Sequence, residues 1–269
     1  MDDTTESARA TGIRITTLAE RPELADALWD MKDSWPEFAT QDSIAWMLYP
    51  RMMAELADHV FAATDEATGE VVAKAFSVPF ALHVAGRDGR LPAQGWEQVL
   101  MWAFSDLRRG VEPDTVSAIE ISVRPDRQGE GLSGRMLAAM RETASARGFT
   151  EVVAPVRPSG KPAEPDTPMH EYAYRTREDG LPYDPWLRVH VRAGGVIDSV
   201  APLSMTIGGS LAQWRGWTGL PFDTAGPVRV PGALSPVHCE PERGYAVYVE
   251  PNVWVRHALG PASAPGGAL

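Results

Sequence analysis

The pattern of apolar and polar residues predicts alternating strands and helices along most of the chain. Period-two alternation and short apolar runs predict strands over 13–18, 59–64, 71–80, 117–123, 151–156, 195–207 and 245–257, the last interrupted at Pro251. Apolar residues at helical spacing predict helices over 22–31, 43–59, 95–109, 132–147, 184–193 and 210–219. Because both kinds of element alternate, the chain is expected to be a mixed α/β protein.

One segment has the most ordered pattern in the chain. Residues 117–123 predict a strand, 124–131 form a loop containing Pro and Gly, 132–147 predict an amphipathic helix, and 151–156 predict a second strand. A strand that returns through a helix runs parallel to the first strand. The sequence therefore predicts one parallel pair among mostly antiparallel elements.

We expect a single domain over residues 12–259. It contains a Pro-rich insertion over 157–185, which is expected to be a long lid with one short helix over 168–175. Residues 1–11 are expected to be disordered, and 260–269 are expected to form a flexible tail of small residues.

Glycines are concentrated in the loop that precedes the predicted helix. Gly129–Gly134 reads Gly-x-Gly-x-x-Gly, which is also the pattern of dinucleotide-binding folds. Five residues separate this pattern from Val123, and the next strand ends at Arg157 without the acid that holds a ribose, although Arg157 suits a 2′-phosphate. A turn with a purely structural role is a further alternative.

With its flanks, the segment Val123-Arg-Pro-Asp-Arg-Gln-Gly-Glu-Gly-Leu-Ser resembles the acetyl-CoA signature of the GNAT acyltransferase superfamily, in particular its bacterial small-molecule type. Gln128 and Gly131 fall on signature positions, whereas Ser133 stands where the family usually has Gly or Ala. The resemblance implies a central mixed, mostly antiparallel sheet with a splayed parallel pair and helices on both faces. It also implies an acyl-CoA co-substrate, most simply acetyl-CoA, and a small-molecule amine as acceptor.

The loop also has a physical reason to bind a diphosphate. Backbone N–H groups at a helix N-terminus point into one concavity, where the helix dipole favours an anion. The resemblance further implies that the backbone of the preceding strand pairs with the pantetheine arm. The expected acyl-CoA-binding residues are Ile121, Val123, Arg127, Gln128, Gly129, Gly131, Leu132, Ser133 and Gly134.

Two residues are candidates for acid–base chemistry. Glu120 lies on the signature strand and is expected to face away from Ile119, Ile121 and Val123, where it would take the proton of an amine. His190 falls where many family members have a Tyr that protonates the departing thiolate, and an imidazole can serve as acid or base near neutral pH. The competing interpretations are a salt-bridged Glu120 and a packed His190.

Composition narrows the partners. The 269 residues include 25 Lys and Arg against 36 Asp and Glu, a net charge of −11, which argues against a nucleic-acid binder. No metal-ligand spacing occurs, and no apolar run is long enough to cross a membrane. With a single cysteine, Cys239, the protein is expected to be cytoplasmic, and a homodimer is possible.

The sequence therefore favours an acyl-CoA-dependent N-acyltransferase that works by direct transfer, because no credible activated nucleophile is present. Two alternatives remain open. One is a non-catalytic acyl-CoA-binding module, and the other is a hydrolase or decarboxylase of CoA thioesters.

Overall fold

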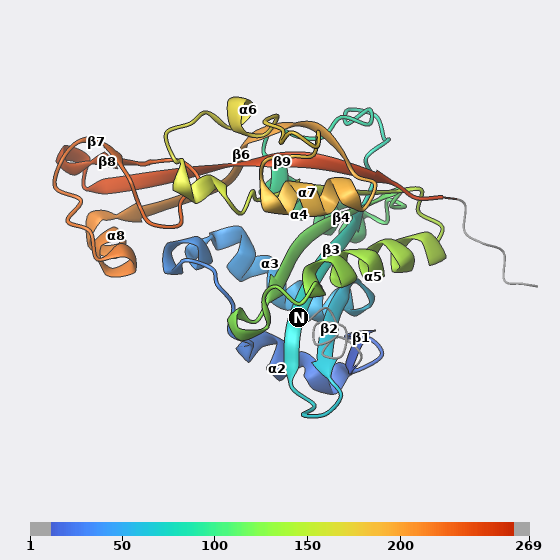
Figure 1. Cartoon of the computed structure of the whole chain (residues 1–269). Helices are drawn as coiled ribbons and strands as arrows, with labels where there is room; N and C mark the ends of the chain where they lie inside the picture. Colours follow the sequence, from blue (N-terminus) through green and yellow to red (C-terminus); the bar gives the residue numbers. More distant parts are fainter. Residues whose placement is uncertain (1–11, 261–269) are drawn as a thin grey trace, which may run out of the picture.

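A computed structural model describes residues 12–260, so the expected disordered segment 1–11 and residues 261–269 of the expected tail lie outside the described residues. Within 12–260 the strands form one sheet, in the order β1-β2-β3-β4-β5-β9-β8-β7, with β6 along the other edge of β9 (Figure 1). The strands are β1 (Ile13–Thr17), β2 (Val60–Asp65), β3 (Val71–Phe80), β4 (Thr115–Val123), β5 (Glu151–Val156), β6 (Val196–Ser210), β7 (Gly226–Val228), β8 (Val237–Glu240) and β9 (Tyr245–Ala258).

Neighbouring strands in this described sheet are antiparallel, except β4 and β5, which are parallel. This topology confirms the predicted mixed sheet with one parallel pair. The same topology excludes the alternative of a dinucleotide-binding fold, because such a fold needs a series of parallel strands.

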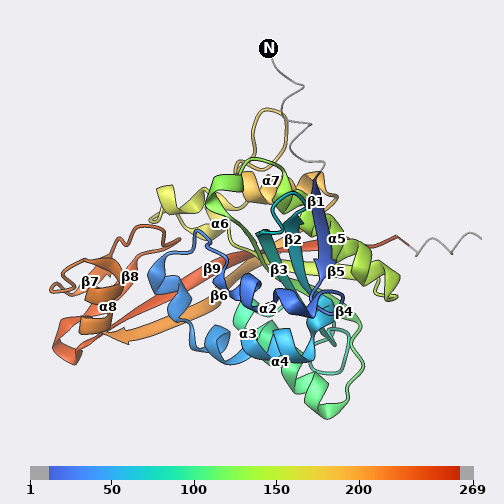
Figure 2. The same ribbon diagram turned by 90° about the horizontal axis from the view of Figure 1, so that it is seen from below.

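Helices cover both faces of the sheet, as predicted (Figure 2). The α-helices are α2 (Ala25–Asp30), α3 (Ser43–Glu55), α4 (Gly95–Arg109), α5 (Leu132–Ala146), α6 (Met169–Tyr172), α7 (Pro185–Arg192) and α8 (Leu211–Thr218). Short 3-10 helices occur at Pro22–Leu24, Glu37–Gln41, Ala57–His59, Pro125–Arg127, Lys161–Ala163 and Pro241–Arg243. Apolar side chains of α2, α3, α4 and α8 pack on one face, and those of α5, α6 and α7 pack on the other.

The alternation of β4 is broken by a bulge, which corrects one prediction. Glu120 is opposite Phe76 but Ala118 is opposite Ser77, so Ile119 is the extra residue of the bulge. Ile119 consequently packs into the cluster under α3 and α4, whereas Ile121 and Val123 pack against the cluster under α5. The prediction that these three residues share a face is therefore wrong, because a bulge shifts the side-chain alternation by one residue.

The parallel pair β4–β5 separates soon after it begins. Only Val116 and Ser117 of β4 pair with β5, opposite Val152 and Val153. Beyond Ser117 the strands diverge, while the other edge of β4 stays paired with β3 as far as Val123. The predicted splay is thus present, and it opens beside the residues of the signature strand.

Two parts of the C-terminal half differ from the expectation. β9 continues through Pro251, because β6 bulges between Ala201 and Met205 at that point and no ladder N–H is needed there. The short strands β7 and β8 were not predicted; with α8, they extend the β6–β9 ribbon beyond the rest of the sheet (Figure 1).

The Pro-rich insertion is an ordered structure packed against the domain. Lys161 is buried and its Nζ donates to the backbone oxygens of Glu164 and Leu234, both at 2.6 Å. Tyr172 is also buried, and its hydroxyl donates to Asp184, which caps α7 as predicted. The predicted short helix is present as α6.

Candidate active site

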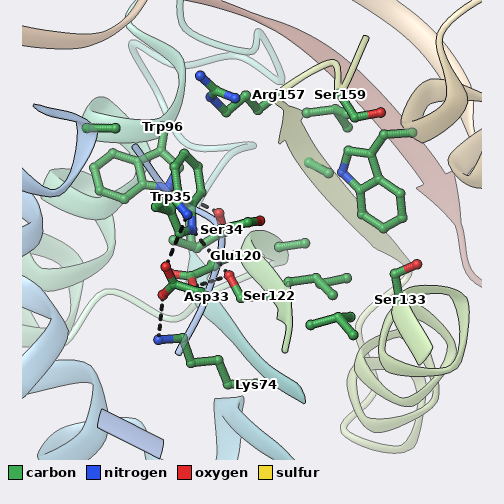
Figure 3. A pocket seen from close by; sticks show the side chains of 18 of the residues that line it. Asp33, Ser34, Trp35, Lys74, Trp96, Glu120, Ser122, Ser133, Arg157 and Ser159 are labelled. Carbon is green, nitrogen blue, oxygen red and sulfur yellow. Dashed lines mark hydrogen bonds and ion pairs between the residues drawn. The ribbon is translucent and has the colours of Figure 1, made fainter. Parts of the chain in front are cut away.

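A cleft of about 940 Å³ runs from the N-terminus of α5 through the gap between β4 and β5 to a chamber walled by aromatic side chains (Figure 3). Of the residues expected to bind acyl-CoA, all except Gly134 line this cleft, and so do Glu120 and His190. The aromatic lining residues are Trp29, Trp35, Trp46, Tyr49, Trp96 and Trp186. One continuous cavity therefore brings the predicted binding loop and both predicted acid–base residues together.

The loop before α5 presents backbone N–H donors to the cleft that have no side-chain cap within residues 12–260. Gly129 and Gly131 have φ values of +84° and +74°, a conformation that favours glycine. Gly131 is the N-cap of α5 and gives it no side-chain cap, so the first N–H groups of the helix have no such partner. Gly134 lies inside the helix, where a Cβ would meet no atom within 4 Å, so neither positive φ nor crowding requires glycine there.

Arg127 lines the same end of the cleft but is already paired. Its Nη1 is 2.9 Å from Asp65, and its Nε is 3.0 Å from both carboxylate oxygens of Glu130. These carboxylates hold the pKa of the Arg127 guanidinium above its usual value. An anion at this loop would therefore rely mainly on the helix N-terminus.

Glu120 is held at the centre of the cleft by two neutral donors. The Tyr49 hydroxyl donates to its Oε2 at 2.7 Å, and the Ser122 hydroxyl donates to its Oε1 at 2.6 Å. Trp35 Nε1 donates in turn to the Ser122 hydroxyl at 3.2 Å. Among the described residues no cation pairs with Glu120, so the alternative of a salt-bridged strand residue is wrong. Burial and the Glu120 charge raise the pKa of Tyr49 well above its ordinary value, so Tyr49 remains a donor.

Two ion pairs flank Glu120 in the chamber. Lys74 Nζ lies 3.1 Å from Asp33 Oδ2. Arg157, at the end of β5, donates through Nε to both oxygens of Glu250 at 3.1 and 3.0 Å. In Figure 3, Arg157 and Lys74 lie at opposite ends of the view, with Glu120 between them. The chamber therefore holds both signs of charge.

His190 lies on α7 beside the gap between the diverging strands. Its side chain is 2% exposed, its Nδ1 is 3.0 Å from Nε2 of His257, and its ring meets the Trp186 ring edge-on at 4.6 Å. Burial, reinforced by His257 and Arg141, lowers the pKa of His190 to about 3. The imidazole is therefore neutral at pH 7, so any part that His190 takes in catalysis at that pH is played by a neutral ring.

Sequence reasoning did not select Tyr49, Ser122, Trp96 or the Arg157–Glu250 pair as site residues. Ser122 left a signal, because it lies two residues from Glu120 on the same strand, and Arg157 was noted only as a partner for a phosphate. Trp96 illustrates the difficulty: its Nε1 donates to the Ile119 backbone oxygen at the bulge, which the chain pattern does not reveal.

Other chemical candidates lie away from the cleft. Cys239 on β8 is fully buried, and burial raises the pKa of its thiol. Within residues 12–260, no group of three or more His, Cys, Asp and Glu side chains is arranged to hold a metal ion. None of the helices in this range has the length and apolarity needed to cross a membrane.

Comparisons with known proteins bear on this site. No protein-family model matches the chain. An arginine N-acetyltransferase of Aspergillus versicolor is 31% identical, over 92% of this chain and 94% of the relative. The loading GNAT-like domain of CurA from Lyngbya majuscula has the same fold, with a TM-score of 0.57 and 18% identity over 92% of this chain and 96% of that domain.

A GNAT-like decarboxylase, GphF, solved with isobutyryl-CoA, gives a TM-score of 0.49 at 16% identity over 92% of this chain and 99% of its own. The identity and near-complete coverage of the arginine N-acetyltransferase settle the relationship, and the CurA domain agrees in fold. The chain belongs to the GNAT superfamily of N-acetyltransferases.

Proposed function

We propose that the protein transfers the acetyl group of acetyl-CoA directly to the primary amine of a small molecule. The observation that supports this proposal most strongly is the single cleft that joins the N-terminus of α5 to Glu120. The diphosphate of CoA would meet the N–H groups of the α5 N-terminus, which no side chain of the described residues caps. The pantetheine arm would follow the open edge of β4 beside Ile121 and Val123.

Glu120 is the proposed general base. An ammonium in the chamber loses a proton to the Glu120 carboxylate, and the neutral amine attacks the thioester carbonyl carbon. The new C–N bond forms, the C–S bond breaks, and the thiolate leaves with the electron pair of that bond. The nitrogen then loses its second proton, which passes to the thiolate, so that the products are a neutral amide and CoA. The aromatic walls limit access of water to the thioester and so favour the amine over hydrolysis.

His190 is proposed to assist the departing thiolate. Its neutral ring bonds to His257 through Nδ1, which leaves Nε2 as the ring nitrogen available to a group in the cleft. A hydrogen bond from Nε2 would stabilise the thiolate in the tautomer in which His257 donates to His190. With a pKa of about 3, His190 is not an imidazolium near pH 7. The proposed role therefore uses the neutral ring, with its proton on Nε2.

The acceptor is proposed to be small because Trp35, Tyr49 and Trp96 wall the part of the cleft around Glu120. Arginine is the first compound to test, because the relative from Aspergillus versicolor is named as an arginine N-acetyltransferase.

The test measures CoA release and acetylated product together, with acetyl-CoA and a panel of amines that includes arginine. We expect CoA release that depends on the amine and is matched by product. CoA release at the same rate without any amine would identify a hydrolase instead. Tight binding of acetyl-CoA in calorimetry with no turnover of any amine would identify a binding module.

A further inference from the structure

We infer that the acceptor is an α-amino acid, with its carboxylate bound by Arg157 and its α-amine facing Glu120. This inference rests on the proposed function, because it assigns the acceptor end of the same cleft. It starts from the donors that Arg157 leaves unused.

The Arg157 guanidinium is only partly engaged by the protein. Its Nε donates to Glu250, and its Nη2 donates to the Gly232 backbone oxygen at 2.6 Å. Its Nη1 makes no hydrogen bond to another residue in the range 12–260. A guanidinium carries five N–H donors, so the two on Nη1 are available. Arg157 lines the cleft and its side chain is 19% exposed, so a ligand can reach it.

The guanidinium is also held in a fixed position. Glu250 is 1% exposed and accepts hydrogen bonds from the Tyr248 hydroxyl at 2.8 Å and from Asn252 Nδ2 at 3.1 Å. On the other side, the guanidinium lies over the Trp35 ring, 5.2 Å from its centroid. A donor fixed before binding does not have to be ordered by the ligand, which favours affinity.

The type of anion follows from the charge. Glu250 already balances the positive charge of Arg157, so the site offers directed N–H donors with little excess positive charge. A singly charged, planar carboxylate matches the N–H donors along this edge of the guanidinium. A phosphate group would need additional positive charge, and the other cation of the chamber, Lys74, is paired with Asp33.

The chamber as a whole matches a zwitterion. The charges of the Lys74–Asp33 and Arg157–Glu250 pairs balance within each pair. Glu120 carries the remaining charge of the chamber, because its hydrogen-bond donors among the described residues are the neutral Tyr49 and Ser122. An ammonium placed at Glu120 and a carboxylate placed at Arg157 satisfy both of these groups, which are labelled in Figure 3. A simple amine satisfies only the first.

The experiment compares matched acceptors that differ only in the carboxylate: arginine with agmatine, and phenylalanine with phenethylamine. For each pair we measure the ratio of kcat/KM for the amino acid to kcat/KM for the amine. Both values come from one preparation, so the fraction of folded protein cancels. We expect the wild-type ratio to exceed one for at least one pair.

Three variants locate the carboxylate site. Glu250→Gln retains Arg157 and removes its counter-charge, so the ratio should hold or rise. The double variant Arg157→Gln/Glu250→Gln leaves no unpaired buried charge, and its ratio should fall at least about tenfold below that of Glu250→Gln, as expected for a lost charged hydrogen bond. Lys74→Gln removes the rival cation, and the ratio should be unchanged whatever happens to turnover.

The inference is overturned if the wild type prefers the amine in both pairs, or if the double variant keeps the ratio of Glu250→Gln within twofold. Loss of the preference in Lys74→Gln alone would overturn it as well. In each of these cases acetyl transfer to the amines continues, so the proposed function survives. No CoA release with any acceptor would instead contradict the proposed function, and this inference with it.

Discussion

Three buried histidines should make the stability of the fold depend on pH between 7 and 5. His59, His190 and His257 are 6%, 2% and 0% exposed. Burial is the largest cause that lowers their pKa values, to about 4, 3 and 4 respectively. In the unfolded chain a histidine titrates near its ordinary pKa of about 6.5. Between these values the unfolded chain binds protons that the folded protein does not.

Proton linkage gives the sign and the size of this change in unfolding free energy with pH. The stability contributed by each neutral histidine is fully present above about pH 6.5 and falls as the pH drops towards the folded pKa. At pH 5 the unfolded state gains about 2 kcal/mol per histidine relative to pH 7, and roughly 6 kcal/mol for the three together. That sum is comparable with the whole unfolding free energy of a small domain.

The assay uses His59→Gln, because His59 lies outside the cleft and glutamine does not titrate. The free energy of unfolding is measured by urea denaturation at pH 7 and pH 5. Between these pH values the wild type should lose about 2 kcal/mol more than His59→Gln. The control is His170→Gln, because the His170 side chain is 73% exposed and its removal should leave the wild-type loss unchanged. Equal losses for wild type and His59→Gln would mean that burial of His59 does not make the stability depend on pH.

Three further predictions concern the cleft. Ser133→Glu places a carboxylate among the first N–H groups of α5 and should weaken acetyl-CoA binding at least about tenfold in calorimetry, whereas Ser145→Glu at the other end of the helix should not. Tyr49→Phe removes the 2.7 Å hydrogen bond to Glu120 and should lower kcat about tenfold while the Kd of acetyl-CoA stays constant. Because the pKa of His190 is about 3, the pH profiles of kcat for the wild type and His190→Phe should have the same shape between pH 6 and 8. A limb near pH 6.5 that vanishes in His190→Phe would contradict this.

Local patterns predicted the elements that depend on local sequence. The range predicted for α4, 95–109, agrees with the structure, and α5 begins at Leu132 as expected. These helices bury one apolar stripe and end near Gly110 and Gly148, so their periodicity and stop signals are visible in the chain. The loop before α5 could be found for the same reason, because its glycines are adjacent in sequence.

Features that depend on distant partners could not be predicted. The bulge at Ile119 comes from the register between β4 and β3, which strand alternation does not report. The contact between His190 and His257 joins residues 67 positions apart, and its effect on the pKa of His190 could not be anticipated. β7 and β8 are short, and their pairing with each other and with β9 defines them more than their composition does.

The chamber residues show the same limit. Glu120 was found because it lies on the signature strand, but its donor Tyr49 is 71 positions away. Arg157 was noticed only as a partner for a phosphate. Its hydrogen bond to Glu250, 93 positions later, holds the guanidinium in a fixed position inside the cleft.

In the proposed reaction, one cleft brings acetyl-CoA and an amine together at Glu120. The most direct measurement is kcat/KM for the amine acceptor and the Kd of acetyl-CoA, both in Glu120→Gln. Loss of the general base should lower kcat/KM at least about 100-fold. The Kd of acetyl-CoA should stay within about twofold of the wild type, because Glu120 lies apart from the α5 N-terminus. Turnover at the wild-type rate in Glu120→Gln would contradict the account.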